Sequence, residues 1–499
     1  MHAFADPYEQ GLKLSGLGRH AEAISRYEQA LSAKPDDARV LFALGNTARA
    51  LGMAGPAAEF YRRVLHRDPA RLEAIVSLAN LLRAEGQPQA AQALLAPALA
   101  RDPQAPELWL TLGSTWREMG DFERAAVHYR EALARKPDYA AALSNLADIL
   151  TDAGETGEAL ALYSKAIAHE PDNAQARLNR AILHLLAGNL KDGWRDYGAR
   201  LNLAKVPVPD HKLTRWTGGS LKRTRLLVTA EQGIGDQILF ASMIPDLAAR
   251  AARDGGAIVL ECEPRLVGLF ARSFPGVAVH PSDMETRGAV HRARYGWLKQ
   301  AGGANAFTEM GSLPKILRGS LEAFPKANDF LKPDPMDMAR WGGLLTGFGP
   351  GPFIGVCWRS GNVLGHRALQ YAPREAWAAF IARVPGTVIS VQYDASDDEV
   401  EALAAQSGRT IVMLPDLDQK NALDRTAALL ASLDVVVSAP TAVSWLAAGT
   451  GVDTYKVLYD TSWTALGQGR EPFAPACELM MPDVRGDWTS AFEKTIARL

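Results

Sequence analysis

The fold of the first part of the chain is decided by residues 109–137, which read WLTLGSTWREMGDFERAAVHYREALARKP. Around this stretch prolines recur every 34 residues, at positions 35, 69, 103, 137 and 171, and glycines keep the same step at positions 18, 52, 86, 120, 154 and 188. A tyrosine or leucine and a small residue recur with the same spacing. These two series are Tyr27, Tyr61, Leu95, Tyr129, Tyr163 and Tyr197, and Ala23, Ala57, Ala91, Ala125, Ala159 and Gly193. Four series with one spacing indicate an internal repeat.

The 34-residue period is typical of tetratricopeptide repeats (TPRs), each a pair of antiparallel helices. The small residue lets the two helices approach closely, and the aromatic residue fills the gap to the next repeat. Glycine turns the chain between helices, and proline ends the second helix. Since one repeat cannot bury its apolar face alone, stacking stabilises the array. The pattern predicts an α-helical TPR solenoid over residues 1–200, with five full repeats and an altered sixth that carries Trp194 and docks as a cap onto the next domain.

Polar residues also recur on the first helix of each predicted repeat, which usually lines the concave groove of such solenoids. They are Asn46, Arg49, Asn80, Arg83, Arg117, Asn145 and Asn179. An asparagine side chain both donates and accepts hydrogen bonds, so this series could hold the backbone of an extended peptide. The alternative is that these residues are only solvated positions on the helix surface.

Composition limits the classes of protein that the chain can belong to. At about 150 residues per domain, 499 residues suggest roughly three domains, and 47% apolar residues supply material for their cores. The formal net charge of −2 gives no basic footprint for nucleic acid. Cys262, Cys357 and Cys477 are far apart, which argues against a disulfide framework or a structural zinc site. We expect a cytoplasmic protein, because neither a signal peptide nor an 18-residue apolar run is present.

The periodicity changes after the repeats. Residues 201–221 contain prolines and glycines with little pattern and read as a linker. Beyond it, short apolar runs such as Arg225-Leu-Leu-Val-Thr alternate with helical stretches, which predicts parallel, doubly wound α/β sheets. An irregular stretch near 281–350 separates two series. We therefore predict two Rossmann-like domains, residues 222–345 and 346–499, with a cleft where the strand ends meet the helix starts.

The loop after the first predicted strand reads Glu231-Gln-Gly-Ile-Gly-Asp. Its glycines, Gly233 and Gly235, permit a tight turn and, with Gln232, close approach of an acceptor substrate. Asp236 has two interpretations. It is either the N-cap of the following helix or a general base aimed into the cleft.

Two loops of the second half could bind an anionic ligand. The candidates are Arg359, Ser360, Gly361, Asn362 and Arg367 in one loop, and Ser438, Thr441 and Ser444 in the other. Arginines could bind phosphate through charge-assisted hydrogen bonds, and hydroxyl groups at a helix start could seat an anion. The alternatives are surface arginines and plain helix caps. Trp445 fits the core better than a platform for a nucleobase.

With these motifs the chain resembles bacterial TPR-containing glycosyltransferases, whose C-terminal half is similar to the two-domain (GT-B) heptosyltransferases. The motifs are Glu231-Gln-Gly-Ile-Gly-Asp, Ser312-Leu-Pro, Gly355-Val-Cys-Trp-Arg-Ser-Gly-Asn and Ser438-Ala-Pro-Thr-Ala-Val. The domain order is also similar to that of the O-GlcNAc transferases. The resemblance implies that Asp236 is the catalytic base, that Gln392 is a strand-end residue of the donor site, and that the loops named above hold donor phosphates. Related proteins commonly read Asp-Thr-Ala-x-x-His in the third loop, where this chain has Pro440 and Trp445.

Among these relatives, the TPR-bearing flagellin glycosyltransferases are the most similar. That resemblance implies an inverting, metal-independent protein O-glycosyltransferase. The array would capture flagellin, and a nonulosonic acid such as pseudaminic acid would pass from its CMP conjugate to Ser or Thr. No cofactor beyond the nucleotide sugar is expected. Two alternatives stay open: a TPR adaptor or secretion chaperone with an inactive glycosyltransferase-like domain, motivated by Pro440 and Trp445, and a transferase acting on glycans or lipids.

Overall fold

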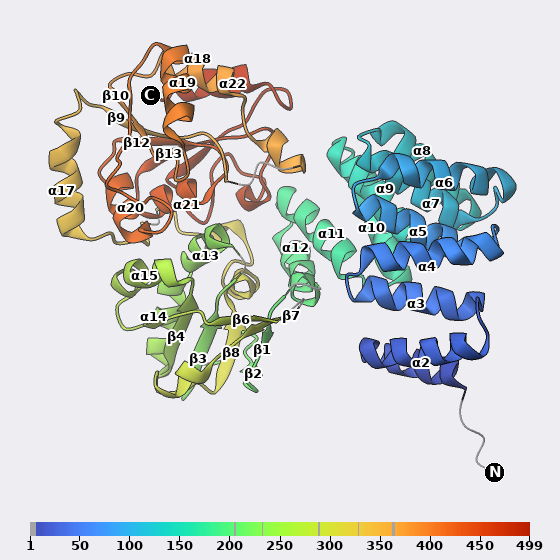
Figure 1. Cartoon of the computed structure of the whole chain (residues 1–499). Helices are drawn as coiled ribbons and strands as arrows, with labels where there is room; N and C mark the ends of the chain where they lie inside the picture. The colour runs from blue at the N-terminus through green and yellow to red at the C-terminus, as the bar shows by residue number, and fades with distance from the viewer. Residues whose placement is uncertain (1–5, 204–205, 232, 288–289, 328, 362–364) are drawn as a thin grey trace. The chain divides into compact units, whose positions relative to one another are not determined.

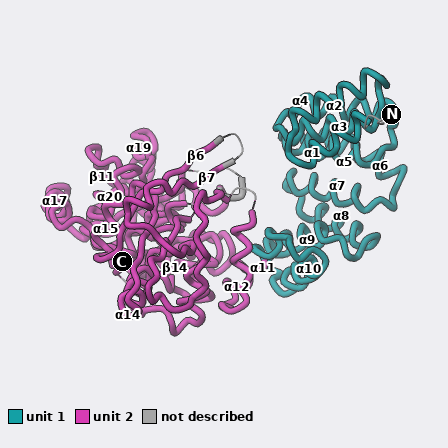
Figure 2. Tube along the Cα trace, turned by 90° about the horizontal axis from the view of Figure 1, so that it is seen from below, with its two compact units in different colours: residues 1–179 teal, residues 180–499 magenta. Residues whose placement is uncertain are grey.

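The computed structural model describes residues 6–203, 206–231, 233–287, 290–327, 329–361 and 365–499. It divides into two compact units, Met1–Asn179 and Arg180–Leu499, coloured separately in Figure 2. The boundary lies inside the sixth predicted repeat rather than at its end, so the second half of that repeat belongs to the second unit. Within the described residues, no helix is both long and apolar enough to cross a membrane.

The first unit is a series of antiparallel helix pairs, as the 34-residue period predicts. Its helices are α1 (Pro7–Gly16), α2 (His20–Ala33), α3 (Ala38–Ala50), α4 (Ala54–Arg67), α5 (Leu72–Ala84), α6 (Pro88–Arg101), α7 (Pro106–Glu118), α8 (Phe122–Arg135), α9 (Ala140–Asp152) and α10 (Thr156–His169), and α11 (Ala174–Leu186) crosses the boundary. The glycines at the turns adopt positive φ angles, for example 75° at Gly52 and 83° at Gly120. This conformation explains the glycine series.

The core of the first unit is built from the two apolar series of the repeat. The small residues Ala57 and Ala125 are fully buried on the second helices, and so are the aromatic rings of Tyr61 and Tyr129. A Cβ atom on Gly45 would lie 2.6 Å from the ring of Tyr61, so the first helix lies directly against that ring. The close helix approach that the sequence predicted is therefore present.

The second unit contains two parallel sheets. The first has the strand order β2-β8-β3-β4-β5. Its strands are β2 (Thr214–Arg215), β3 (Arg225–Thr229), β4 (Ala257–Cys262), β5 (Ala278–Pro281) and β8 (Ala306–Glu309), and its helices include α13 (Ile234–Ala241), α14 (Ile244–Asp254), α15 (Val267–Ser273) and α16 (Leu313–Leu317). One helix was expected near 236–252, but two are found. Pro245 stands in the first turn of α14. Proline has no N–H to donate, so it fits the start of a new helix better than the interior of a continuous one.

The second sheet has the order β11-β10-β9-β12-β13-β14, all parallel. Its strands are β9 (Phe353–Cys357), β10 (Thr387–Ser390), β11 (Ile411–Val412), β12 (Val435–Ser438), β13 (Asp453–Val457) and β14 (Cys477–Met480). Its helices are α17 (Pro335–Leu345), α18 (Arg374–Ile381), α19 (Asp397–Ser407), α20 (Leu423–Leu430), α21 (Ala442–Gly449) and α22 (Trp488–Ile496). The chain leaves β9 in one direction and returns to its other side at β12, which is the order of a Rossmann fold.

The predicted linker is partly ordered. It contributes β2 to the first sheet and β1 (Val208–Pro209) to a small third sheet with β6 (Met284–Arg287) and β7 (Val290–Ala293), which lie in the stretch expected to be irregular. Before the linker, α12 (Leu190–Tyr197) and a 3₁₀ turn, η1 (Gly198–Asn202), pack against the α/β part. Trp194 is 3% exposed, and its indole N–H donates to the carbonyl of Arg318 over 3.0 Å. The predicted docking cap is thus an integral part of the second unit.

Candidate functional site

A cavity of about 630 Å³ lies between the two Rossmann-like sheets, and residues from both line it. The lining residues lie at or after the carboxyl ends of β3, β4, β9, β10, β11, β12 and β13. Beside it, α13 of the first half packs against α21 of the second (Figure 1). The cavity has the volume of a typical small-molecule site and occupies the position at which doubly wound folds bind ligands.

The wall from the first half carries Asp236. This residue is exposed and lines the cavity together with Gly235. The interpretation of Asp236 as an N-cap is wrong, because Gly233 occupies the cap position and Asp236 is the third helical residue. Gly233 has a φ angle of 80°, and a Cβ atom there would lie 3.1 Å from the carboxylate Oδ2 of Asp236. Glycine therefore lets the loop turn tightly beside that carboxylate; Gln232 lies outside the described residues.

Residues of η1 and η4 (Met310–Ser312) anchor the start of this loop. Arg200 Nη2 donates to Glu231 Oε1 over 2.6 Å, and the Gly311 N–H donates to the same oxygen over 2.9 Å. The side chains of Arg200 and Glu231 are 10% and 13% exposed, so this ion pair is shielded from solvent. Burial raises the pKa of Tyr197, and the charge of nearby Asp236 adds to the rise. The end of the last repeat thus surrounds the Asp236 loop.

A buried carboxyl group supports the loop from β4. Glu261 Oε2 accepts hydrogen bonds from the Ala230 N–H over 3.0 Å and from the Tyr295 hydroxyl over 3.1 Å, while Oε1 is buried without a partner in the described structure. Burial raises the pKa of Glu261 from 4.5 to about 7. Because Ala230 directly precedes Glu231, the Glu261 carboxyl group holds the backbone at the start of the loop.

The raised pKa predicts a pH effect on stability. Between about pH 4.5 and 7 the folded chain keeps a proton on Glu261 that the unfolded chain has released, so the free energy of unfolding falls as pH rises through this window. Glu261→Gln removes the effect. We expect its stability relative to the native chain to increase by up to roughly 3 kcal/mol from pH 5 to pH 8. Urea unfolding at several pH values measures this, with Glu263→Gln as the control; parallel profiles would contradict it.

The wall from the second half begins with Thr441, the N-cap of α21. Its hydroxyl accepts from the Val443 N–H over 3.3 Å, and the residue lines the cavity with Ser360. Ser438 and Ser444 are fully buried, and their hydroxyls donate to the carbonyls of Ala439 and Thr441. Of the three hydroxyl ligands predicted in this loop, Ser438, Thr441 and Ser444, only Thr441 therefore lines the cavity. The Thr441 side chain is a helix cap, as the alternative interpretation predicted. The N-terminal end of α21 nevertheless lines the cavity.

Arg359 does not line this cavity. Its guanidinium donates to Glu399 over 2.7 and 2.5 Å and to Asp394 over 3.0 Å. The hydrogen bonds to Glu399 raise the pKa of Arg359, and two carboxylates neutralise its charge within the fold. The predicted phosphate contact through this arginine has no support from the geometry.

The strand-end glutamine shapes the β9 loop from within. Gln392 is 3% exposed, its Oε1 accepts from the N–H groups of Trp358 and Arg359 over 3.0 Å each, and its Nε2 donates to the Arg359 carbonyl over 2.9 Å. Gln392 therefore positions the loop and is not placed to contact a donor. The Gly361 N–H donates to the Tyr393 hydroxyl over 2.5 Å. Asn362 lies outside the described residues, and of Arg367 only the backbone, in η6 (Gly365–Gln370), is described.

Lys456, near the end of β13, was not among the predicted site residues. It lines the cavity although it is 2% exposed, and its Nζ lies 2.6 Å from Glu471 Oε1 and 3.6 Å from the centre of the Trp445 ring. Trp445 itself lines the cavity and is not confined to the core. The signal in the sequence was a lysine within an apolar strand, since a lysine buried in a parallel sheet needs a partner.

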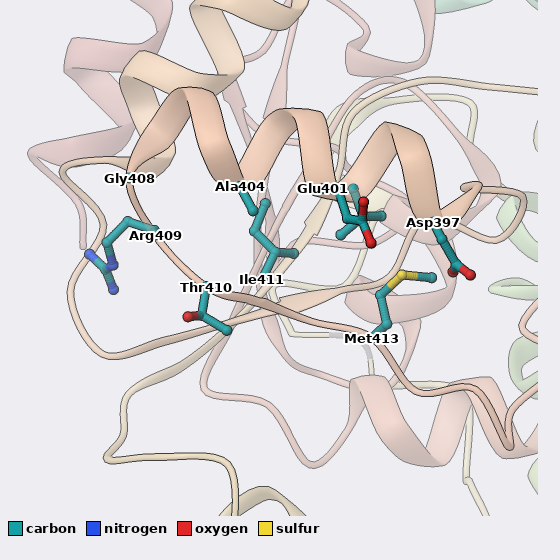
Figure 3. Close-up of a pocket in the computed structure, with 9 residues that line it drawn as sticks. Asp397, Glu401, Ala404, Gly408, Arg409, Thr410, Ile411 and Met413 are labelled. Carbon is teal, nitrogen blue, oxygen red and sulfur yellow. The ribbon is translucent and has the colours of Figure 1, made fainter.

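A second depression, of about 470 Å³, lies between α19 and β11 at the edge of the sheet and shares none of the lining residues of the cavity. Figure 3 shows Asp397, Glu401 and Ala404 along the face of α19, opposite Ile411. Arg409, the cation of this depression, donates to the carbonyls of Val384 and Gly386 over 2.6 Å each. Because that charge is used within the fold, we assign no chemistry to this depression.

The predicted groove residues of the array lie on the first helices, as expected. Most of them bond to other residues of the first unit. Arg83 pairs with Glu118 of the next repeat, Arg117 with Asp148, and Asn179 Nδ2 donates to Asp148 Oδ1 over 2.8 Å. The other contacts are Tyr61 to Asn46, Arg83 to Asn80, and Asn145 to Ser114, while Arg49 is exposed. This polar face therefore connects successive repeats. Asp148, which was missed, is in the register of Asn46 and Asn80.

Comparisons with known proteins support the repeat array. Two tetratricopeptide repeat models match residues 12–171 and 150–193. Protein FlbA of Caulobacter vibrioides is 33% identical over 324 residues, which are 64% of this chain and 53% of FlbA. The match thus spans about half the length of that relative. Since 324 residues exceed the array, the similarity extends into the α/β unit.

Solved structures of TPR proteins match about a third of this chain. The thermophilic TPR protein TTC0263 of Thermus thermophilus is 29% identical with a TM-score of 0.33, and the match covers 36% of this chain and 98% of that one. MamA is 24% identical with a TM-score of 0.29, and the match covers 35% and 99%. The N-terminal region is a TPR array, followed by an α/β region with parallel sheets.

Proposed function

We propose that the chain is a protein O-glycosyltransferase. The cavity between the Rossmann-like sheets binds a nucleotide sugar, and the TPR array binds the acceptor protein. The observation that carries this proposal is the 630 Å³ cavity, because its walls from the two halves supply an exposed carboxylate, Asp236, and the N-terminal end of α21. Transfer of a group from a phosphate to a hydroxyl requires a base that accepts the hydroxyl proton and a partial positive charge that stabilises the leaving phosphate.

The proposed step is a single displacement. The oxygen of an acceptor Ser or Thr hydroxyl attacks the anomeric carbon while the bond from that carbon to the phosphate oxygen breaks. The hydroxyl proton passes to the Asp236 carboxylate, and the bonding electron pair leaves with the phosphate. Attack from the opposite face inverts the anomeric centre. Backbone N–H groups at the start of α21 stabilise the negative charge on the leaving group.

The resemblance to flagellin glycosyltransferases supports the choice of substrates. It favours a CMP-linked nonulosonic acid, such as CMP-pseudaminic acid, as donor and flagellin as acceptor. The array supplies a surface that can bind the acceptor protein in the same chain as the α/β unit, since repeat arrays present extended binding surfaces. The identities of the donor and the acceptor are part of the proposal.

A specific observation favours a second candidate, a TPR adaptor with an inactive α/β unit. Arg359 is neutralised by Glu399 and Asp394, and Pro440 and Trp445 replace the acidic residue and the histidine of related proteins. An adaptor binds its protein partner but needs no nucleotide. The two candidates therefore differ in nucleotide binding.

The test is a thermal-shift panel with CMP, UDP and GDP on the full chain. A ligand at a hundred times its Kd adds about 2.7 kcal/mol to the free energy of unfolding. We expect one nucleotide to raise the Tm. Purified flagellin incubated with the chain and CMP-pseudaminic acid should then gain the mass of the sugar, as intact-mass analysis measures. A flat panel together with an unchanged acceptor mass would leave only the adaptor.

A further inference from the structure

Lys456 is the deeply buried cation in the wall of the cavity. It comes from β13 and lines the cavity although it is only 2% exposed. We propose that Lys456 binds a phosphate oxygen of the nucleotide and that Glu471 holds this lysine in place while limiting its affinity for the phosphate. The inference deepens the proposed function and rests on it, because it names the residue that receives the leaving group.

The other described charges on the cavity wall are less suited to this role. Arg265 pairs with Glu263 over 2.6 Å and also donates to the carbonyl of Lys420. Lys420 is exposed, so solvent screens its charge. Asp236 is an anion. Lys456 thus combines burial, where charge interactions are strong, with a position near Thr441 on the same wall.

The surroundings of Lys456 leave it capacity for a ligand. One N–H is directed to Glu471 Oε1, 2.6 Å away, and the ammonium lies over the Trp445 ring. Lysine has three N–H donors, and Glu471 is the one carboxylate that it contacts within the described part of the chain. The Thr464 hydroxyl donates to the same Glu471 oxygen over 2.9 Å, which fixes the carboxylate. A phosphate oxygen entering the cavity would satisfy a remaining donor.

The ion pair also explains how a lysine can be kept at this position. A buried ammonium without a partner is costly, and Glu471, which is fully buried, compensates it. The same carboxylate repels an incoming phosphate. Removing the charge of Glu471 should therefore strengthen phosphate binding, whereas removing both charges should weaken it. A pair with only a structural role predicts no such opposite effects.

Three forms of the full chain test this by isothermal titration with CMP, UDP and GDP. We expect Glu471→Gln to bind the preferred nucleotide about tenfold more tightly than the native chain. The double variant K456M/E471Q should bind it roughly tenfold to a hundredfold more weakly. Either single substitution leaves one buried charge without its counter-ion. Lys456→Met leaves a bare carboxylate and can prevent folding, whereas Glu471→Gln keeps an oxygen that accepts a hydrogen bond from Lys456, and the double variant removes both charges at similar volume.

Cytidine, uridine and guanosine are the controls, because they lack the phosphate. The nucleoside of the preferred nucleotide should bind all three forms equally. Native-like nucleotide affinity in K456M/E471Q, or weaker binding by Glu471→Gln, overturns the role of Lys456 and leaves the proposed function standing. If the native chain binds none of the nucleotides, the inference and the proposed function both fail.

Discussion

Asp236→Asn is expected to lower sugar transfer by roughly 10²–10⁴-fold, the usual contribution of a general base. The carboxylate is exposed on the cavity wall, and Gly233 turns the chain beside it. An amide of the same shape cannot take the hydroxyl proton at neutral pH. Since the substitution removes no buried group, the Kd for the nucleotide should stay unchanged, and the Tm should fall only slightly through the loss of the charge at the start of α13. Initial rates of transfer to the acceptor, measured by mass, give the effect.

Asp397→Asn is the matched control. Asp397 also stands in the first turn of a helix of the second unit but lines the separate depression at the edge of the sheet. Both substitutions therefore remove one negative charge near a helix N-terminus, where each has a similar effect on stability. Transfer should be lost only in Asp236→Asn. Equal rates in the two variants would remove Asp236 from the mechanism.

The second prediction concerns the residue at which the chain can be truncated to remove the repeats while the α/β unit still folds. A fragment of residues 174–499 retains α11, α12 and η1 and is expected to fold. A fragment of residues 201–499 lacks Trp194, Tyr197 and Arg200. It exposes the surface on which these aromatic rings pack and leaves Glu231 without its partner. Losing one buried aromatic side chain costs about 3–5 kcal/mol, so we expect the shorter fragment to be unfolded or aggregated.

Circular dichroism and the thermal unfolding of the two fragments test this prediction. The full chain carrying Trp194→Ala and Arg200→Ala is the control that keeps the array in place. It should be destabilised in the same direction, because it loses the contacts to Trp463 and Glu231 while retaining the repeats. Cooperative unfolding of 201–499 at the temperature of 174–499 would show that η1 and α12 are dispensable.

The sequence predicted the features that depend on local pattern. The spacing of proline, glycine and tyrosine identified the repeats, because these residues have the same task in every repeat. The apolar runs located the strands, and the loops after β3 and β12 were correctly expected at the carboxyl ends. Asp236 and Thr441 were therefore brought to one cavity by topology alone.

The remaining features depend on partners distant in the chain. Arg359 is neutralised by Glu399, 40 residues later, which no local motif reveals. Lys456 was not predicted as a site residue, since its site exists only once Glu471 packs beside it. Asp236 was considered as an N-cap because the exact start of a helix depends on φ angles that sequence specifies poorly. The sequence also did not show that the second unit begins inside the sixth repeat. This repeat keeps the 34-residue period, but its aromatic residues pack against the α/β part.

The polar bonds along the array have a consequence for how the chain can change in length. Tyr61 to Asn46, Tyr129 to Ser114 and Tyr163 to Asp148 are the same contact in the second, fourth and fifth repeats, each joining residues 15 positions apart within one repeat. Because each of these bonds lies within one repeat, duplication or deletion of a whole helix pair would leave the bonds of the other repeats intact. Evolution could adjust the reach of the array in steps of one helix pair and leave the chemistry of the α/β unit untouched.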